Sequence, residues 1–460
     1  MTDIVFDPEL IERYAGTGPR YTSYPTAMQF TDHYGAQDYA ADVRVSNESG
    51  RALSLYLHIP FCRSLCYYCG CTKIVTRNAE RVESYLDDLK REIALQGALF
   101  SRTRPVRQLH LGGGTPTYLS AAQLDDLLAH IADHFTLVQD NTQEFSVEVD
   151  PRTVDHAALD HLAAHDFNRL SLGVQDFEPA VQEAVNRLQS VDEVRSLTEH
   201  ARACGFRSVS YDLIYGLPLQ DVASFDRTLV EVAKLRPDRI AIYNYAHLPQ
   251  RFRGQRMIHA EDLPARPVKL DILRHSLTLL TDAGYEYIGM DHFALPDDEL
   301  TRAQKDGTLQ RNFQGYSTHS DCDLIGLGMS AISHIGNSYA QNVTSTKEYA
   351  DALARDELPI YRGLRLSDDD LRRADVIQEL MCFDRVRFSS FENRYALPFE
   401  RYFEQELSAL QLLADDRLVE IDDDAIHVTT RGRLLLRTIA QVFDRYHGAA
   451  SKTQRFSQTI

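Results

Sequence analysis

Four cysteines lie within ten residues, and their spacing is the strongest chemical feature of the chain. In the segment CRSLCYYCGC, Cys62, Cys66 and Cys69 are spaced C-x3-C-x2-C, and Cys71 follows after one glycine. Three thiolates from one tight loop suit three corners of a four-iron cluster and leave the fourth iron without a protein ligand. An iron with an open position is a place for chemistry. The spacing therefore indicates a reactive [4Fe-4S] cluster.

Two other uses of clustered cysteines match this spacing less well. A structural zinc site usually takes its ligands as two separated pairs, and four thiolates within ten residues would be strained around one ion. A ferredoxin run has a different spacing and supplies every iron with a ligand. Both alternatives remain open on spacing alone. A disulfide framework is disfavoured, because in a reducing cytosol such a group indicates metal binding or redox chemistry.

Six short strand-like runs, alternating with stretches of helical period, have to position this loop. They predict parallel strands at 53–58, 106–111, 145–149, 169–174, 208–214 and 239–245. Parallel strands joined by helical crossovers close into a barrel or form a curved open sheet, and the site forms at their carboxyl ends. The runs are followed in turn by the cysteine loop, GGGTPT, DP, QDF, YGLP and AHLP. The sequence thus predicts an α/β fold of the partial parallel (β/α)6-barrel type.

The rest of the chain suggests three parts: an N-terminal arm at 1–50, the barrel domain at 51–360 and a mainly helical C-terminal domain at 361–460. The arm carries turn and extended signals but no sustained helical period. The C-terminal part has a winged-helix-like order, with a hairpin, RLVEI then AIHVTT, before a helix at 431–446. We expect the run YEYIGMDHFA to extend the sheet and the polar segment 297–320 to fold over the mouth of the barrel.

Composition and charge exclude several classes of protein. The 460 residues are 43% hydrophobic and 25% charged, as expected for a globular chain of two or three domains. No apolar run approaches the ~18 residues of a membrane span, and the start MTDIVFDPEL does not resemble a leader, so we expect a cytoplasmic protein. A net charge of −18 argues against sequence-independent binding of nucleic acid. An anionic substrate would need a local basic patch.

Four polar side chains end or follow successive predicted strands: Glu148, Gln175, Arg187 and Asp212. Together they could bind the ammonium, hydroxyl and carboxylate groups of a zwitterionic ligand. For each residue alone, a satisfied polar group at a sheet edge is an equal alternative.

The cysteine spacing, with an aromatic residue before the third cysteine, resembles that of the radical S-adenosylmethionine superfamily. In that superfamily the methionyl amine and carboxylate chelate the open iron, and one electron splits the sulfonium to give a deoxyadenosyl radical. The resemblance implies that Tyr68 meets the adenine. It also implies that the backbone of Gly113, Gly114 and Thr115 approaches the methionine amine, an approach that a Cβ would block.

Further motifs along nearly the whole chain resemble the oxygen-independent coproporphyrinogen III dehydrogenases. They include PRYTSYPTA, YLHIPFC, HLGGGTPTYL, EVDPR, NRLSLGVQDF, DLIYGLP, NYAHLP, IGMDHFALPDDEL, RNFQGYST and the ending QRFSQTI. Members of that family hold two S-adenosylmethionine molecules. By position, the first would contact Tyr56, Gly113, Glu148 and Arg187. The second would contact Tyr68, Gly114, Thr115, Gln175, Asp212, Ala246 and Ile332. We expect Tyr56 and Cys71 to be catalytic.

Similarity to this family implies oxidative decarboxylation of two propionates of coproporphyrinogen III to vinyl groups, giving protoporphyrinogen IX for haem synthesis without oxygen. For the substrate carboxylates, Arg20, Tyr21, Tyr24 and Arg311 are the candidates. We expect a monomer that takes electrons from an external low-potential donor such as flavodoxin or ferredoxin. A second cluster is not expected, because the other three cysteines are dispersed.

A haem-binding chaperone of the same superfamily is the main alternative. Those relatives share the three-cysteine loop but typically show an acidic residue after the third cysteine and lack the PRYTSYPTA arm and a further cysteine such as Cys71. This chain has the arm and Cys69-Gly70-Cys71, which favours the enzyme. A zinc-stabilised interaction protein is a third possibility.

Overall fold

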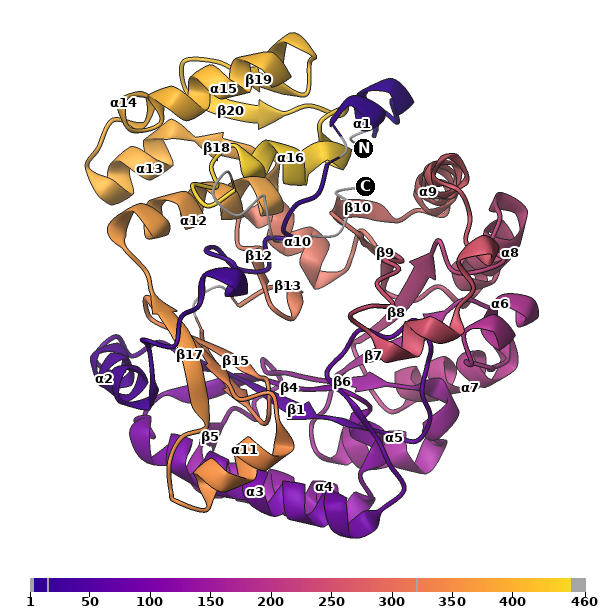
Figure 1. Cartoon of the computed structure of the whole chain (residues 1–460), viewed down its shortest axis with the longest axis vertical. Coiled ribbons are helices and arrows are strands. Elements are labelled where there is room, and N and C mark those ends of the chain that lie inside the picture. Colours follow the sequence, from indigo (N-terminus) through magenta and orange to yellow (C-terminus); the bar gives the residue numbers. More distant parts are fainter. Residues whose placement is uncertain (1–3, 15, 320–321, 448–460) are drawn as a thin grey trace.

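The predicted parallel strands form the centre of one large curved sheet (Figure 1). The structure, a computed structural model, describes residues 4–14, 16–319 and 322–447. The parallel strands are β1 (Leu53–Ile59), β4 (Pro105–Gly113), β6 (Glu144–Val149), β7 (Arg169–Gln175), β8 (Ser208–Tyr215) and β9 (Arg239–Asn244). Each begins and ends within about two residues of its predicted limits.

These strands lie side by side in the order β9, β8, β7, β6, β4, β1, and every neighbouring pair is parallel. On the far side of β1 the sheet continues through β14 (Asp323–Leu327), β15 (Ile332–Ile335), β16 (Ser338–Asn342) and β17 (Ile360–Arg365). β14 pairs in parallel with β1, whereas the last three strands are antiparallel. The sheet ends in edge strands on both sides, so the predicted partial barrel is confirmed as a curved open sheet.

Amphipathic helices between the strands cover the outer face of the sheet (Figure 1). They are α3 (Ala79–Leu99), α4 (Ala121–His134), α5 (His156–Ala164), α6 (Pro179–Ala184), α7 (Val191–Ala203), α8 (Val222–Leu235) and α9 (Arg266–Asp282). Ser120, Ser190 and Asp221 begin three of them, each accepting a hydrogen bond from a backbone amide in the first turn. No helix of the described ranges is long and apolar enough to cross a membrane.

The inner face of the parallel strands is unusually polar. Buried and partly exposed residues alternate along β6, where the partly exposed ones are Glu144, Ser146 and Glu148, and β8 alternates in the same way around Asp212. Parallel strands covered on both faces normally read as continuous apolar runs. Here the polar side chains line a cavity of about 180 Å³ inside the curve of the sheet.

We expected the segment 297–320 to cover the mouth of the barrel, and this was wrong for its described part, residues 297–319. It forms α10 (Glu299–Asp306) and a hairpin of β12 (Gln310–Asn312) and β13 (Gly315–Ser317). Asp298 pairs with Arg239, and Glu299 with Arg169, at the first residues of β9 and β7. These ion pairs draw the segment to the amino ends of the strands. The run before it extends the sheet as expected, through the antiparallel strands β10 (Glu286–Gly289) and β11 (His292–Ala294).

The arm contains two helices that its sequence signals did not predict, α1 (Pro8–Tyr14) and α2 (Ala36–Asn47). Each buries only a few side chains, so neither leaves a sustained period. Leu10 and Ile11 of α1 pack into the core of the C-terminal domain, whereas Tyr39 of α2 packs into the core around the sheet. The arm therefore bridges the two parts of the molecule (Figure 1).

The C-terminal part has its own hydrophobic core, in which Phe399, Phe403 and Phe443 are fully buried. Its helices are α12 (Asp368–Phe383), α13 (Phe388–Tyr395), α14 (Phe399–Tyr402), α15 (Glu404–Asp415) and α16 (Leu436–Gln441). The predicted hairpin is confirmed as β19 (Val419–Ile421) and β20 (Ala425–Val428), which pairs with β18 (Arg385–Arg387).

The last predicted helix, 431–446, is shorter than expected. A 3-10 turn at Arg433–Leu435 leads into α16, and the chain turns after Gln441. Asp444 then accepts hydrogen bonds from the Tyr446 amide and the Tyr21 hydroxyl, interactions with which a continuous helix would compete. The QRFSQTI motif lies outside the described residues.

Candidate active site

The cysteine loop begins where β1 ends. β2 (Phe61–Cys62) pairs in parallel with β3 (Ile74–Val75), which closes the loop at its base. Burial, together with the nearby thiols of Cys69 and Cys66, raises the pKa of Cys62 to about 11. The fold therefore brings the three predicted ligands together at the carboxyl edge of the sheet.

Cationic and hydroxyl groups surround these sulfur atoms. Arg152 and Arg187 donate to Cys66 Sγ at 3.2 and 3.4 Å. The Thr115 hydroxyl donates to Cys62 Sγ at 3.6 Å. Hydrogen bonds from protein groups to the sulfur atoms tune iron–sulfur clusters. This donor set fits a [4Fe-4S] cluster held by three thiolates.

Asp150 holds the two arginines in place. Its Oδ2 lies 2.6 Å from Arg152 and 3.1 Å from Arg187, and Arg187 also donates to the carbonyl of Gly173 at 3.1 Å. Burial opposes ionisation of Asp150, but the two guanidinium groups outweigh it and lower the pKa of the carboxyl below its usual value. Asp150 and Arg152 belong to the EVDPR motif, to which sequence reasoning gave no role beyond Glu148.

The glycine segment packs against the end of β1. A Cβ on Gly113, whose φ is +112°, would lie 2.6 Å from His58 Nδ1. A Cβ on Gly114 would lie 2.6 Å from the Pro60 backbone, and the Gly114 amide donates to the Ile59 carbonyl at 2.8 Å. Both positions thus need glycine for the close approach of β4 to β1, in addition to any need of a ligand.

A chain of hydrogen-bonded and stacked side chains runs across β1, β4 and β6. His58 Nε2 lies 2.9 Å from the Thr72 carbonyl, to which it donates, so His58 Nδ1 accepts from the Tyr56 hydroxyl at 3.1 Å. The Tyr56 ring stacks on His110, whose Nε2 lies 3.2 Å from Glu148 Oε1. Sequence reasoning gave no role to His58 or His110. Alternation along β1 turns His58 toward the same face as Tyr56, and His110 of β4 lies directly beside Tyr56 on that face.

Glu148 is held as a carboxylate. Its Oε2 accepts from the Gly113 amide at 3.0 Å. Burial opposes ionisation, but the hydrogen bonds from His110 and Gly113 prevail, so the pKa of Glu148 lies below its usual value. Asp212 behaves differently, because burial raises its pKa to about 6 even though Ser171 donates to it at 2.9 Å. Two carboxyl groups in one interior therefore differ in their tendency to carry charge.

The remaining predicted contacts lie on both sides of the loop. Gln255 Nε2 donates to the carbonyls of Tyr68, at 2.9 Å, and Ala246, at 3.2 Å, and so ties these two segments together. Gln175 ends β7 with a left-handed φ of 67°. On the other side, the Ile332 backbone packs against Gly326, which pairs with Tyr56. The fold thus brings all the predicted contact residues to this end of the sheet.

Cys71 is the most exposed of the four loop cysteines. Its thiol hydrogen-bonds with that of Cys69, which raises the pKa of Cys71, and the Glu148 carboxylate raises it further. Cys71 therefore lies beside Cys69 and near the Glu148 carboxylate.

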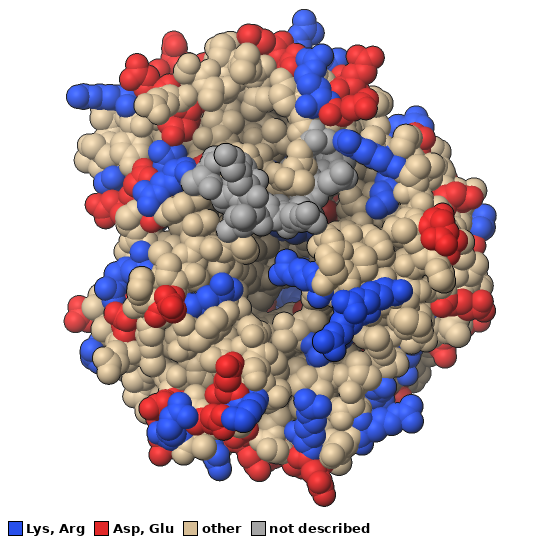
Figure 2. All heavy atoms as spheres, in the orientation of Figure 1, with Lys and Arg blue, Asp and Glu red and all other residues tan. Residues whose placement is uncertain are grey.

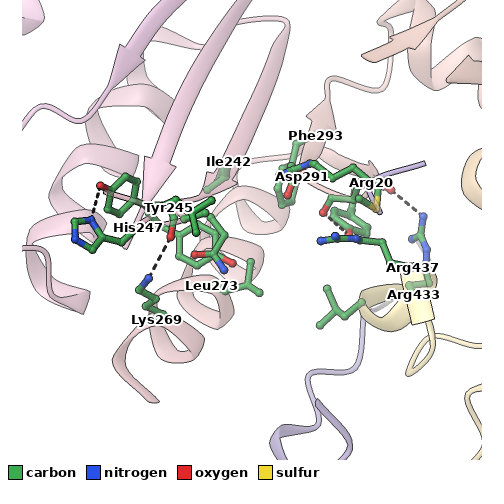
Figure 3. A pocket seen from close by; sticks show the side chains of 17 residues that line it. Arg20, Ile242, Tyr245, His247, Lys269, Leu273, Asp291, Phe293, Arg433 and Arg437 are labelled. Carbon is green, nitrogen blue, oxygen red and sulfur yellow. Dashed lines mark hydrogen bonds and ion pairs between the residues drawn. The ribbon is translucent and has the colours of Figure 1, made fainter. Parts of the chain in front are cut away.

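A cavity of about 280 Å³ opens beside the carboxyl ends of β8 and β9 (Figure 3). Arg20 from the arm lines it and pairs with Asp291. On the other side of the cavity, Lys269 of α9 donates to the Tyr245 carbonyl at 3.3 Å, and burial lowers the pKa of its ammonium. Arg433 and Arg437 add two further cations to the walls. In the orientation of Figure 2, the molecular surface has a hollow near its middle with Lys and Arg side chains beside it, although the net charge of the chain is −18.

Of the substrate-binding candidates, only Arg20 faces this cavity. Tyr21 and Tyr24 are 2% and 3% exposed and pack into the C-terminal core, where the Tyr21 hydroxyl donates to Asp444. Arg311 lies on β12, with its guanidinium 4.8 Å from the Tyr316 ring centroid. Sequence reasoning did not predict three further cations of this cavity, Lys269, Arg433 and Arg437. They belong to no local motif, and only the fold brings them to the same cavity as Arg20.

We compared the chain with family models, curated proteins and solved structures. The family model for the radical SAM superfamily matches residues 56–232, and that for the HemN C-terminal domain matches residues 366–435. Curated oxygen-independent coproporphyrinogen III oxidases from Pseudomonas aeruginosa and Escherichia coli are each 49% identical over 457 residues, 99% of both chains. The solved structure of coproporphyrinogen III oxidase (HemN) from Escherichia coli, a radical SAM enzyme, superposes with a TM-score of 0.92 and 48% identity. It covers 97% of this chain and 100% of that one. The chain therefore belongs to the family of oxygen-independent coproporphyrinogen III oxidases within the radical SAM superfamily.

Proposed function

We propose that the protein oxidises coproporphyrinogen III without oxygen, converting two propionate side chains to vinyl groups and giving protoporphyrinogen IX for haem synthesis. For each propionate, one hydrogen atom passes to a 5′-deoxyadenosyl radical, the carboxylate leaves as carbon dioxide, and one electron passes to an external electron acceptor. The observation that carries this proposal is the 49% identity, over 99% of both chains, to enzymes named for this reaction. Because that similarity extends through the arm and the C-terminal domain, it favours the enzyme over a haem-binding chaperone.

Cys62, Cys66 and Cys69 would hold the [4Fe-4S] cluster at the carboxyl edge of the sheet. When bound and reduced, the cluster supplies the electron that cleaves S-adenosylmethionine into methionine and a 5′-deoxyadenosyl radical able to take hydrogen from a propionate. Arg152 and Arg187 keep the sulfur environment cationic. Cys71 and Tyr56 are proposed as catalytic residues, supported by the position of one beside Cys69 and of the other in the chain leading to Glu148.

Two S-adenosylmethionine molecules are proposed. For the first, Glu148 offers a carboxylate to the methionyl ammonium, with Tyr56, Gly113 and Arg187 around it. For the second, the proposed contacts are Tyr68, Gly114, Thr115, Gln175, Asp212, Ala246 and Ile332. The bridge that Gln255 makes between Tyr68 and Ala246 supports one continuous binding surface for the second molecule.

The cations of the 280 Å³ cavity are proposed to bind the carboxylates of coproporphyrinogen III. The substrate is a tetracarboxylate, and a protein of net charge −18 repels it unless positive charge is concentrated locally. Lys269 is the best placed of these cations, because its hydrogen bond goes to a carbonyl and it makes no ion pair with any described residue.

The electron is proposed to come from an external flavodoxin or ferredoxin. Cys204 caps the C-terminal end of α7, Cys322 directly precedes β14, and Cys382 lies in α12, so the other three cysteines belong to separate parts of the fold. We infer that the protein acts in the cytoplasm, because the loop cysteines must stay reduced. We also propose that it acts as a monomer, because all the proposed contact residues come from one chain. The division at residues 50 and 360 also remains a proposal, supported by the separate core of the C-terminal part.

Anaerobic reconstitution tests the proposal. Reconstituted protein, S-adenosylmethionine, a reducing system and coproporphyrinogen III should yield protoporphyrinogen IX, carbon dioxide, methionine and deoxyadenosine. Stable binding of haem with undecarboxylated substrate would establish the chaperone instead.

A further inference from the structure

Three potential metal ligands meet on the outside of the molecule, between α4 and α5. Asp125 comes from α4, and His161 and His165 are separated by one turn of α5 and its C-terminal cap. Asp125 Oδ1 lies 3.0 Å from His161 Nε2 and 2.6 Å from His165 Nε2. The three donor atoms all lie within 4.8 Å of one another. Both helices are on the outer layer, away from the interior that the sheet encloses (Figure 1).

The hydrogen bonding of this group is incomplete. Although His161 Nε2 is close to the carboxylate, it is buried from solvent and has no hydrogen-bond partner in the described part of the chain. His165 Nε2 already makes the well-directed bond to Asp125 Oδ1. Buried polar atoms in native proteins nearly always find a partner. A cation between the three donors would supply one for His161.

Two similar groups nearby show what a complete arrangement looks like. Asp160, His200 and Cys204 meet between α5 and α7, but His200 Nε2 and Cys204 Sγ both hydrogen-bond to Asp160 Oδ1, at 2.8 and 3.0 Å. His130, one turn before His134 on α4, bonds to the Lys90 carbonyl at 2.8 Å. Neither group contains a buried donor atom left without a partner. The group on α4 and α5 is therefore the one that calls for an ion.

We propose that Asp125, His161 and His165 bind a divalent transition-metal ion of the zinc class. Two imidazole nitrogens and one carboxylate oxygen are ligands that zinc takes in proteins, with water completing a tetrahedron. The side chains of Asp125 and His165 are 50% and 32% exposed, so an ion and its water can enter from their side of the group. The bound ion joins α4 to α5 and stabilises the outer layer. This inference does not depend on the proposed function.

Zinc binding by the reconstituted holoenzyme tests the proposal, because iron then occupies the loop cysteines. Zinc bound at buffered free concentrations is measured by elemental analysis, and its ligands by X-ray absorption at the zinc edge, which is separate from that of iron. One zinc per chain with only nitrogen and oxygen ligands is expected. Loss of outer-shell residues weakens metal sites roughly 10- to 100-fold, so loss of a ligand in His165→Ala should cost at least about 100-fold.

Two further variants make the result decisive. Asp125→Asn keeps the shape of the side chain and should also weaken zinc binding. Weaker binding in this variant would therefore show the loss of a ligand even if His165→Ala failed to fold. His130→Ala removes a histidine from the same helix layer and should bind zinc like the unaltered protein. Zinc should raise the Tm of the unaltered protein and of His130→Ala, but not that of His165→Ala. Sulfur in the zinc shell, unchanged binding by His165→Ala, or no zinc bound at micromolar free metal would overturn the proposal.

Discussion

The cysteine loop and the cavity beside α9 both hold cations at the carboxyl edge of the sheet, but they engage them differently. At the loop, Arg152 and Arg187 are bound by Asp150 and by Cys66 Sγ. In the cavity, Lys269 contacts a backbone carbonyl, and Arg20 is paired with Asp291. The loop is thus assembled by contacts within the chain, whereas the cavity keeps a cation whose charge the described residues do not neutralise.

Because of this difference, mutations in the two regions should have different effects. Removing one member of a buried ionic network leaves its partners uncompensated, so the cost falls on stability. Removing a cation that pairs only with a bound anionic ligand weakens binding of that ligand and changes the stability of the fold little. The predictions below separate the two regions on this basis.

Cys62→Ala, Cys66→Ala and Cys69→Ala should each abolish the brown four-iron chromophore and all cleavage of S-adenosylmethionine, because each removes the only protein ligand of one iron. Absorption spectra, iron analysis and deoxyadenosine formation measure this. Cys204→Ser, far from the loop at the end of α7, should keep the chromophore. A variant of the three that retained a full cluster would contradict the ligand assignment.

Cys71→Ser should keep the chromophore while losing turnover, because Cys71 lies beside the proposed ligands and is not counted among them. The cluster content and the rate of protoporphyrinogen formation are compared in the same preparation. Loss of the cluster in this variant would make Cys71 a ligand.

Arg187→Met should destabilise the fold by about 1.5–3 kcal/mol, because it removes the more deeply buried of the two guanidinium groups that hydrogen-bond to Asp150 and Cys66, while Arg152 still pairs with both. Anaerobic urea unfolding gives the free energy of unfolding. Arg227→Met, which breaks the exposed pair with Glu178, is the matched control and should unfold like the unaltered protein. Equal stability of the two variants would show that the ion pairs at the loop contribute no more than an exposed ion pair does.

Lys269→Met should raise the KM for coproporphyrinogen III by roughly 10-fold or more, with kcat little changed, because a hydrogen bond to a charged group is worth about 1.5–3 kcal/mol. Steady-state kinetics under anaerobic conditions measure both constants. Lys269→Arg should recover part of the loss, and Lys90→Met, on the outer face of α3, should have no effect. An unchanged KM would mean that the carboxylates bind elsewhere.

Glu92 extends the comparison to a buried carboxyl group whose hydrogen-bond donors are all neutral. It accepts from Tyr349, Gly328 and Asn342, and burial raises its pKa from 4.5 to about 7, whereas the pKa of Asp150 is lowered. Its contribution to stability is fully present below pH 4.5, the unfolded value, and is lost as pH rises through about 7. Between pH 5 and 8, the free energy of unfolding should therefore fall less steeply with pH in Glu92→Gln than in the unaltered protein. Equal slopes for the two proteins would show that the pKa of Glu92 is not raised in the fold.

Local patterns in the sequence were enough to predict the cysteine loop and the six strands of the barrel. The ligands Cys62, Cys66 and Cys69 share one short loop, so their spacing carries the chemistry directly. Strand limits follow from apolar runs bounded by turn residues. The resemblance to a known family added the site residues, which the fold brings to one end of the sheet. The helices of the arm were missed because each buries too few side chains to show a period.

Residues that are close together in the sequence were sufficient to predict the loop and the six parallel strands, because those structures depend on neighbours within a turn or a short apolar run. Only the tertiary structure decided that Arg152 and Arg187 meet at one sulfur, and that Lys269 faces the same cavity as Arg20. It also decided that α10 lies beside the amino ends of β7 and β9. Such contacts join residues tens to hundreds of positions apart. They depend on strand order and on the balance of burial and charge, which no local pattern records.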